Sequence, residues 1–419
     1  MSFQQALSGL NAASRNLDVI GHNIANSGTT GFKASRTEFS EAMASASGSA
    51  SGQSVGIGVS VGAVTQQFKQ GGITSTGNNL DVAINGNGFF MLRQPDGSSA
   101  FTRAGNFNTD KAGNLKTLTG DQVLGYPVDT VTGKAQTGQP PVPMVFSPGQ
   151  TMAAKTTTEV SVNMNLDARA KVGAGDPAAT PPIPATPRAT YGTSLNVYDT
   201  QGVATPLSLY FVKSATANTW EVYTTLDETV QAPGSPVATI AFDASGNPTP
   251  NPLPAINISL NATNNPNRPT PDKIDFKLDL SKVTQFGTKF AVNDNKQNGY
   301  TAGSMTGISI SGDGSVVASY SNGVKRTEGQ LALASFTNPQ GLAATGNNKW
   351  VATAESGLAV AGLAQTGTLG TLQSGALEDS NVDLTAELVN MMTAQRAYQS
   401  SAQAIKTQDQ VFSTLVNLR

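Results

Sequence analysis

Few residues of this chain could carry out chemistry, and its single histidine, His22, limits the choice most. A Ser-His-Asp triad or a histidine-containing zinc site would have to be built around it. His22 lies in a segment whose spacing predicts a helix, and the sequence places no cluster of carboxylates beside it. The chain also lacks cysteine, which excludes disulfides and thiolate metal sites. We therefore expect His22 to have a structural role.

Three glycine-containing motifs have simple structural interpretations. "GDG" at 312–314 suggests a calcium loop, but the other acidic ligands of an EF-hand are missing, so we expect a turn. "NGNGFF" holds a lone GxG outside the context of a nucleotide site, and "GTTGFK" ends in Lys33 without Walker spacing. A carboxylate pair for glycoside hydrolysis depends on the fold and stays open at this point, although carboxylates are sparse. We see no catalytic constellation, and we expect no enzymatic activity, no cofactor and no metal.

The composition indicates turn-rich β structure with an unusually neutral surface. The 419 residues suffice for two or three domains, and they include 43 glycines and 22 prolines but only 6% aromatic residues. Charged residues make up 13% of the chain, about half of the usual ~25%. The net charge of -2 gives no sign of binding to nucleic acid or to an anionic membrane. Low surface charge weakens repulsion between copies, so it is compatible with dense self-association.

The start of the chain is not typical of a secretory signal. "MSFQQALSGL" lacks a basic region followed by an uninterrupted apolar run. No stretch of the sequence approaches the ~18–20 apolar residues of a membrane span. We therefore expect no cleaved signal peptide and no membrane partner.

Both ends of the chain predict long amphipathic helices. Apolar positions near the N-terminus and in residues 384–419 alternate steps of four and three, which is the spacing of a coiled-coil seam. "NSG" at 26–28 ends the first helix, and Gly28 suits a left-handed C-cap. Polar residues interrupt both seams, so we expect the ends to pair weakly and to need neighbours from other copies. The seam residues expected to mediate self-assembly are Phe3, Leu7, Leu10, Leu17, Ile24, Leu384, Leu388, Met391, Tyr398, Ile405, Phe412 and Val416.

The body of the chain predicts β domains nested between the helices. An Ala/Ser/Gly tract at 44–54 is typical of a flexible linker, and residues 80–130 indicate a β-meander. Short strands at 150–298 indicate an antiparallel sandwich or barrel, after which the earlier pattern returns. The predicted fold class is therefore mainly β with terminal α-helices paired as a coiled coil. The predicted domains are a discontinuous helical core domain with linker at 1–71 and 373–419, a discontinuous inner β domain at 72–149 and 299–372, and an outer β domain inserted at 150–298.

Several segments resemble one protein family. "GLNAASRNLDVIGHNIANSGTTGFKASRTEF" at 9–39 resembles the N-terminal signature of the bacterial flagellar axial proteins of the rod and hook. "GALEDSNVDLTAELVNMMTAQRAYQSSAQAIKTQDQVFSTLVNL" at 375–418 resembles the matching C-terminal signature, and "GFFML", "FTRAGNF" and "VLGYP" resemble the shared inner β domain. The large insertion is similar to the hook branch rather than to the shorter distal-rod branch, which stays the alternative. The signature residues are Asn23, Ala25, Asn26, Gly31, Phe32 and Lys33.

The resemblance implies a structural subunit that polymerises into a hollow, curved helical tube, a universal joint that transmits torque from rod to filament. It also implies an extracellular location in the flagellum, export without a cleaved signal, and four partners besides further copies of the chain. These are the distal rod protein, the hook cap protein, the hook–filament junction protein and the flagellar export apparatus. A β-rich extracellular fibre or adhesin, which should lack paired terminal heptads, and a hydrolase, which should show clustered carboxylates, are the alternatives from other classes.

Overall fold

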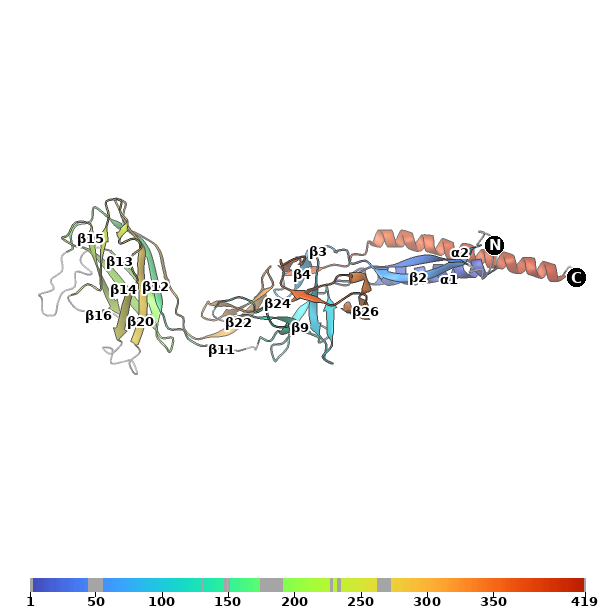
Figure 1. Ribbon diagram of the computed structural model, residues 1–419, viewed down its shortest axis with the longest axis horizontal. Helices are drawn as coiled ribbons and strands as arrows, with labels where there is room; N and C mark the ends of the chain where they lie inside the picture. The colour runs from blue at the N-terminus through green and yellow to red at the C-terminus, as the bar shows by residue number, and fades with distance from the viewer. Residues whose placement is uncertain are drawn as a thin grey trace. The chain divides into compact units, whose positions relative to one another are not determined.

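The fold is mainly β with one long helix near each end of the chain (Figure 1), as predicted. The computed structural model describes residues 3–43, 56–129, 132–146, 149, 151–173, 191–226, 229–231, 235–261 and 273–417. The chain divides into two compact units. The first unit comprises Met1–Pro148, Gly307–Ser319 and Lys325–Arg419, and the second comprises Gly149–Thr306 and Tyr320–Val324. The linker predicted at 44–54 lies outside the described residues.

The first unit contains both helices. Helix α1 covers Phe3–Ala25 and helix α2 covers Leu384–Asn417. They run antiparallel, because Gly9 faces Ser401 while Asn23 bonds Glu387. A long hairpin, formed by β1 (Ser35–Met43) and β2 (Gly56–Gln66), packs against α1. The helical end of this unit is therefore three-layered, with α1 between α2 and the hairpin.

The rest of the first unit is a β body assembled from both sides of the chain. Early strands pair antiparallel with late ones: β4 with β29, β3 with β30, β5 with β25, β6 with β27 and β9 with β24. Phe89, Phe101 and Trp350 form one of its buried clusters. The strands are β3 Ile73–Ser75, β4 Val82–Asn85, β5 Phe89–Arg93, β6 Ser99–Thr102, β7 Phe107–Thr109, β8 Leu115–Thr117, β9 Gln122–Pro127, β10 Val142–Pro143, β23 Ser315–Tyr320, β24 Lys325–Leu331, β25 Leu333–Ser335, β26 Ala343–Gly346, β27 Lys349–Val351, β28 Val360–Gly362, β29 Thr371–Ser374 and β30 Ala376–Glu378, with a short 3-10 turn at Pro339–Gly341.

The second unit is a sandwich of two sheets around one core. One sheet has the order β19-β20-β12-β21, and the other has the order β13-β14-β15-β17-β18 with β16 beside β15. Alternate residues of β12 and β14 point into the shared core, which also buries Trp220. The sandwich strands are β12 Glu159–Asp167, β13 Tyr191–Tyr198, β14 Ala204–Lys213, β15 Thr219–Leu226, β16 Thr229–Gln231, β17 Ala238–Phe242, β18 Pro248–Thr249, β19 Ile256–Asn261, β20 Lys273–Phe286 and β21 Ala291–Gln297. β11 Thr151–Met152 and β22 Gly303–Ile310 lie outside these two sheets and pair with each other.

The sandwich departs from the prediction at one point, because β12 and β20 pair in parallel rather than antiparallel. Short strands at regular spacing indicate a sandwich, but spacing does not say which strands become neighbours. β12 is the first strand of this unit's two sheets and β20 comes near the end, so a long connection allows their parallel pairing.

The two ends of the sandwich segment lie next to each other. Lys155 and Tyr300 exchange two backbone hydrogen bonds, each with an N–O distance of 2.9 Å. The Asn298 side chain accepts bonds from the backbone N–H groups of Thr158 and Glu159. A segment whose ends meet in this way can be cut out or inserted with little strain on the rest of the chain.

We predict that residues 155–300 fold when expressed alone. Trp220 is fully buried in the shared core, and its Nε1 donates to Gln285 at 2.8 Å, so the isolated segment should show the blue-shifted fluorescence of a buried indole and a cooperative thermal transition. A red-shifted, non-cooperative signal from the isolated segment would show that the sandwich depends on the first unit.

Candidate assembly surface

The contact between the two helices includes several small side chains. On α1 the buried row includes Ala6, Ala13 and Ile20, and a Cβ placed on Gly9 would lie 3.2 Å from the Ser401 Oγ. On α2 most of the less exposed positions form one row with steps of three and four, as a coiled-coil seam requires. The row consists of Glu387, Met391, Ala394, Ser401, Ile405 and Gln408, with Tyr398 just above one-third exposed, and Ala402 and Ala404 are half-buried beside it. Small residues on both sides let the two backbones approach closely.

This row only partly coincides with the seam expected from the sequence. Met391, Tyr398 and Ile405 belong to both rows, and Leu10, Leu17 and Ile24 are half-buried on α1. The remaining expected residues with described side chains lie exposed: Phe3, Leu7, Leu384, Leu388 and Phe412. Val416 lies in α2, but its side chain is outside the described part of the chain. Their expected role in self-assembly stays a prediction.

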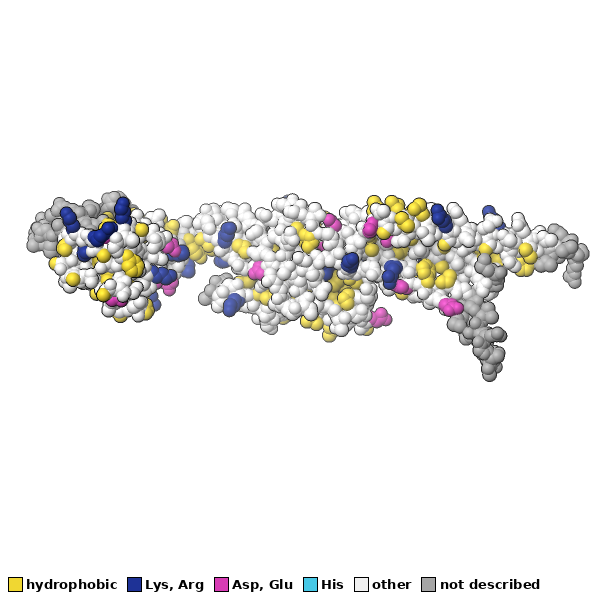
Figure 2. Space-filling view, turned by 90° about the horizontal axis from the view of Figure 1, so that it is seen from above, with side chains coloured by type: hydrophobic (Ala, Val, Ile, Leu, Met, Phe, Trp, Pro, Cys, Tyr) yellow, Lys and Arg dark blue, Asp and Glu magenta, His cyan; other side chains and the backbone are white. Residues whose placement is uncertain are grey.

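Large apolar side chains cover the outer face of the first half of α2. Figure 2 shows hydrophobic side chains gathered over this part of the molecule. Leu384, Leu388, Val389 and Met392 are each about half exposed, at 46–53%. Contiguous exposed apolar side chains on a soluble protein mark an interaction surface. We call these four residues the outer patch.

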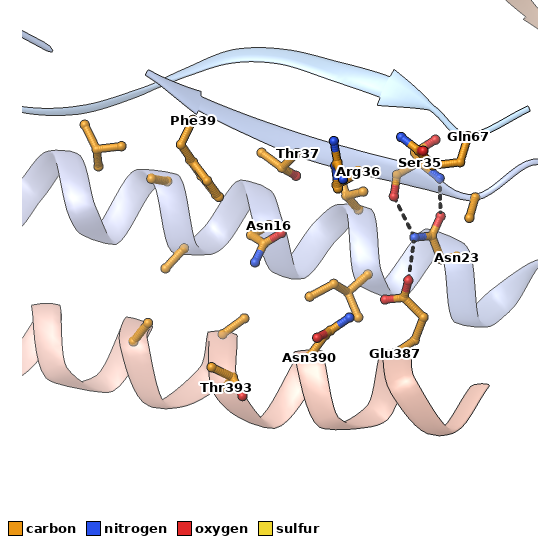
Figure 3. A pocket seen from close by; sticks show the side chains of 18 of the residues that line it. Asn16, Asn23, Ser35, Arg36, Thr37, Phe39, Gln67, Glu387, Asn390 and Thr393 are labelled. Carbon is orange, nitrogen blue, oxygen red and sulfur yellow. Dashed lines mark hydrogen bonds between the residues drawn. The ribbon is translucent and has the colours of Figure 1, made fainter. Parts of the chain in front are cut away.

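A groove of about 640 Å³ lies between α1, α2 and the β1–β2 hairpin (Figure 3). Its walls are mostly apolar and include Ala12, Val19, Ile20, Phe39 and Val59. The Thr37 hydroxyl lines the same groove and is buried without a hydrogen-bond partner in the described part of the chain. We call this space the helix–hairpin groove.

The signature residues lie at the end of α1 and hold chain segments together. Asn23 is the centre of one joint: its Nδ2 donates to the Ser35 carbonyl at 2.8 Å and to Glu387 Oε1 at 3.2 Å, and its Oδ1 accepts from the Ser35 N–H at 2.8 Å. This one side chain therefore ties α1 to both β1 and α2 (Figure 3). Asn26 caps the helix by donating to the His22 carbonyl, and Ala25 is exposed at the last position of α1.

The turn after α1 differs from the prediction at its glycines. Gly31, and not Gly28, has the left-handed conformation, with φ of 69°. Its N–H donates to the Glu378 carbonyl at 2.7 Å, and a Cβ there would lie 2.6 Å from the Ala104 nitrogen. A contact with a residue distant in sequence therefore fixes the position of the glycine. Phe32 is buried beside it, and its ring centroid lies 5.4 Å from that of the exposed His22. The structural role expected of this histidine stays a prediction.

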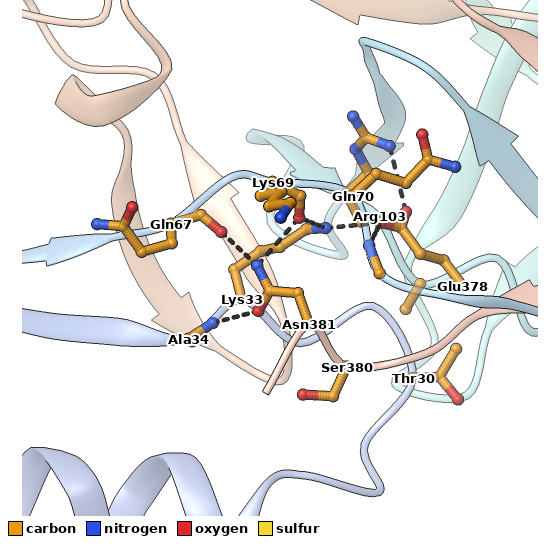
Figure 4. Close-up of polar contacts among 12 residues, drawn as sticks. Thr30, Lys33, Ala34, Gln67, Lys69, Gln70, Arg103, Glu378, Ser380 and Asn381 are labelled. Atoms are coloured by element: carbon orange, nitrogen blue, oxygen red, sulfur yellow. Dashed lines mark hydrogen bonds and ion pairs between the residues drawn. The ribbon is translucent and has the colours of Figure 1, made fainter. Parts of the chain in front are cut away.

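A fully buried carboxylate lies at the centre of the second joint (Figure 4). Glu378 pairs with Lys33 at 2.6 Å and with Arg103 at 3.2 Å, and it also accepts from the Gly71 N–H at 3.0 Å. The Lys33 Nζ donates further to the Lys69 carbonyl at 2.9 Å. Four chain segments that are far apart in sequence meet at this one side chain.

Burial sets the electrostatics of this joint. It lowers the pKa of Lys33 below its ordinary value, because the charged ammonium loses water, and the carboxylate of Glu378 partly offsets this effect. Burial lowers the pKa of Arg103 for the same reason. Two cations share one anion here, so removal of the carboxylate would leave both without their counter-ion.

Neighbouring amides complete the joint. Asn381 accepts from the Ala34 N–H and donates to the carbonyls of Gln67 and Lys69. The sequence marked Lys33 as the end of a motif, but it gave no signal for Glu378, Arg103 or Asn381. Because Lys33 ends a glycine motif that lacks phosphate-binding spacing, its charge could have prompted a search for an acidic partner in the chain. The acidic residues of "GALEDSN" were the candidates.

The described residues hold no group of three or more His, Cys, Asp or Glu side chains that could bind a metal ion. Asp313 forms a turn, in which it accepts from the N–H and hydroxyl groups of Ser315. None of the helices is both long enough and apolar enough to cross a membrane within the described part of the chain.

Four sequence families match successive parts of the chain. Residues 3–33 match "Flagella basal body rod protein", and residues 83–165 match "Flagellar hook protein FlgE/F/G D1 domain". Residues 165–300 match "Flagellar basal body protein FlaE D2 domain", and residues 373–418 match "Flagellar basal body rod FlgEFG protein C-terminal".

Full-length relatives and a solved structure agree with these matches. The chain is 43% identical to the flagellar hook protein FlgE of Escherichia coli (strain K12), with 100% of each chain covered. It is 33% identical to the flagellar hook protein FlgE of Rhizobium meliloti (strain 1021), covering 100% of this chain and 98% of the relative. The crystal structure of Helicobacter pylori flagellar hook protein FlgE2 aligns with a TM-score of 0.52 at 16% identity, over 73% of this chain and 100% of that chain. This last similarity supports the fold alone.

The buried joint leads to a prediction about stability. Glu378→Gln keeps the shape of the side chain but leaves Lys33 and Arg103 buried without an anion, which should cost about 3–5 kcal/mol. The fluorescence of Trp350, in a Trp220→Phe background, reports unfolding of the first unit in guanidinium. Lys33→Met is the matched control: it retains the Arg103–Glu378 pair and should cost less. Equal losses from both changes would contradict a joint centred on the carboxylate.

The seam leads to a prediction about the helix pair. Ile405→Asp puts a charge into the partly buried contact and loses part of the roughly 1.5–3 kcal/mol that full burial of such a side chain contributes. Hydrogen exchange of peptides from 3–25 and 384–417 should then become faster. Lys406→Asp changes the next residue, which is exposed, and should leave both rates close to those of the unaltered chain. Unchanged exchange in Ile405→Asp would contradict the seam described above.

Proposed function

The chain belongs to the flagellar hook protein family, and from this membership we propose that it polymerises into a hollow, curved helical tube. As a member of the family it is a structural component of the bacterial flagellum. The proposed tube joins rod to filament and transmits torque as a universal joint. We further propose that the chain has no enzymatic activity.

The outer patch carries this proposal. Leu384, Leu388, Val389 and Met392 remain about half exposed after the two helices of one chain have paired. Burial of such side chains contributes roughly 1.5–3 kcal/mol each when complete, so covering their exposed part would favour a contact with a second copy. Phe3 and Leu7 are exposed near the start of α1 and would add to the same kind of contact. A tube repeats this contact at every subunit.

The β regions suit contacts that shift as the tube bends. With 13% charged residues, the chain presents large neutral polar surfaces that exert little mutual repulsion. Interfaces that switch between a few packed arrangements are a known means of conformational change. We propose three domains: a helical core domain with linker of 1–71 and 373–419, an inner β domain of 72–149 and 299–372, and an outer β domain of 150–298.

The family also suggests a route and a set of neighbours. We propose that the subunit is exported without a cleaved signal peptide and resides outside the cell. Its proposed partners are other copies of the chain, the distal rod protein, the hook cap protein, the hook–filament junction protein and the export apparatus. The absence of cysteine from the sequence fits passage as an unfolded chain, since no disulfide could form on the way.

We predict that Leu388→Asp abolishes tube formation while the monomer stays folded. Leu388 is 47% exposed in the single chain, so a charge there costs the monomer little but would be buried in the proposed contact. Circular dichroism of the monomer and negative-stain electron microscopy of the assembled material measure the two effects. Gln403→Asp introduces the same charge at an exposed polar position outside the outer patch and should still allow tubes. Normal tubes from Leu388→Asp would exclude the outer patch as an assembly contact.

A further inference from the structure

Helix α2 extends past the start of α1, and its seam row continues beyond that point. Gly9 faces Ser401 and Asn23 bonds Glu387, so the antiparallel offset places Phe3 opposite about residue 407. The remaining residues of α2, which run to Asn417, have no described α1 residue beside them. Figure 1 shows this end of α2 projecting beyond the N-terminal helix. We call residues 409–417 the overhang.

Phe412 is the next residue of the seam row after Ile405 and Gln408. The row repeats steps of four and three, and Phe412 follows Gln408 by four, so it points in the direction that α1 would occupy if α1 were longer. Instead its side chain is 54% exposed, and the neighbouring Val411 is 48% exposed. The seam thus continues for one more large apolar residue after its partner in the same chain has ended.

The helix–hairpin groove has mostly apolar walls that complement the overhang. Phe39, at its edge, is 48% exposed. Its volume of about 640 Å³ falls within the ~300–1,000 Å³ range of pockets that hold ligands of many atoms, so an aromatic side chain and a neighbouring aliphatic one would fit. The residues that line it supply Asn and Thr side chains as well, which suits a helix end carrying polar residues between apolar ones.

The overhang cannot fill the groove of its own chain. The α2 residues that line the groove end at Ala397, and the overhang begins twelve residues later on the same uninterrupted helix. The two segments are therefore about 18 Å apart along the helix axis, and a continuous helix cannot bend back to bring them together. An occupant with the chemistry of the overhang must come from another copy.

We propose that the overhang of one subunit inserts Phe412 into the helix–hairpin groove of a neighbouring subunit. A patch that fits a pocket elsewhere on the same molecule makes a head-to-tail contact, and repetition of such a contact builds an open helical assembly. The groove also offers the buried Thr37 hydroxyl as a polar partner close to the inserted helix end. This inference rests on the proposed polymerisation and names the segment and the site that meet in it.

The natural absence of cysteine makes the contact testable by cross-linking between copies. Two single-cysteine chains with different tags, Phe412→Cys and Phe39→Cys, are mixed, assembled into tubes and oxidised. Because each chain has one cysteine, a disulfide must join two copies. We expect heterodimers on a denaturing gel, in many-fold excess over the yield from Phe412→Cys mixed with Ser40→Cys. Ser40 is the matched control, since it is adjacent on β1 and its side chain points to the opposite face of the hairpin.

Several outcomes overturn the proposal without affecting the proposed function. Tubes that form but give equal or no cross-linking at Phe39 and Ser40 would exclude the groove. Preferential joining of Phe412→Cys chains to each other would show that overhangs pair symmetrically. Normal tubes from Phe412→Asp would also contradict insertion, because this exposed residue can be changed without loss of monomer structure. Failure of the unaltered chain to form tubes would instead count against the proposed function itself.

Discussion

The first unit depends on one buried carboxylate. Glu378 holds Lys33, Arg103 and the Gly71 N–H at once, and its own backbone carbonyl receives the N–H of Gly31. The helical end of the unit and its β body are therefore joined where the chain leaves α1 and where it approaches α2. A buried charge without partners would be costly, so this arrangement is stable only when all of these segments are in place. The joint makes the fold of the two chain ends conditional on the strands between them.

On the two helices, small and large side chains lie on different faces. Small residues such as Ala6, Gly9 and Ala394 face the partner helix of the same chain, whereas Leu388 and Met392 face outward. The intramolecular pair thus gains close backbone approach but buries little apolar area. The half-exposed side chains of the outer patch remain available for contacts with other copies, as the proposed assembly requires.

The second unit, unlike the helical end, has the features of a segment that could fold independently. Its ends meet at Lys155 and Tyr300, and its core lies between its own two sheets. Changes of size or sequence within the sandwich need not disturb the joint at Glu378. The nested order of the chain therefore separates a region under strict geometric constraint from one that can vary.

The sequence by itself determined the helical ends, the β-rich body and the family. Four-and-three spacing without glycine or proline in residues 384–419 is enough to predict a helix, and the signature around Asn23 and Lys33 is enough to indicate the family. Only the tertiary structure decided which face of each helix pairs with the other helix. Heptad spacing defines an apolar stripe but not the element that covers it, and the β1–β2 hairpin packs against α1 as well as α2 does. The tertiary structure also decided that Gly31 takes the left-handed turn in place of Gly28, and that Lys33 serves as a counter-ion. Both depend on Glu378, which lies 345 residues from Lys33 and can be matched to it only by the folded chain.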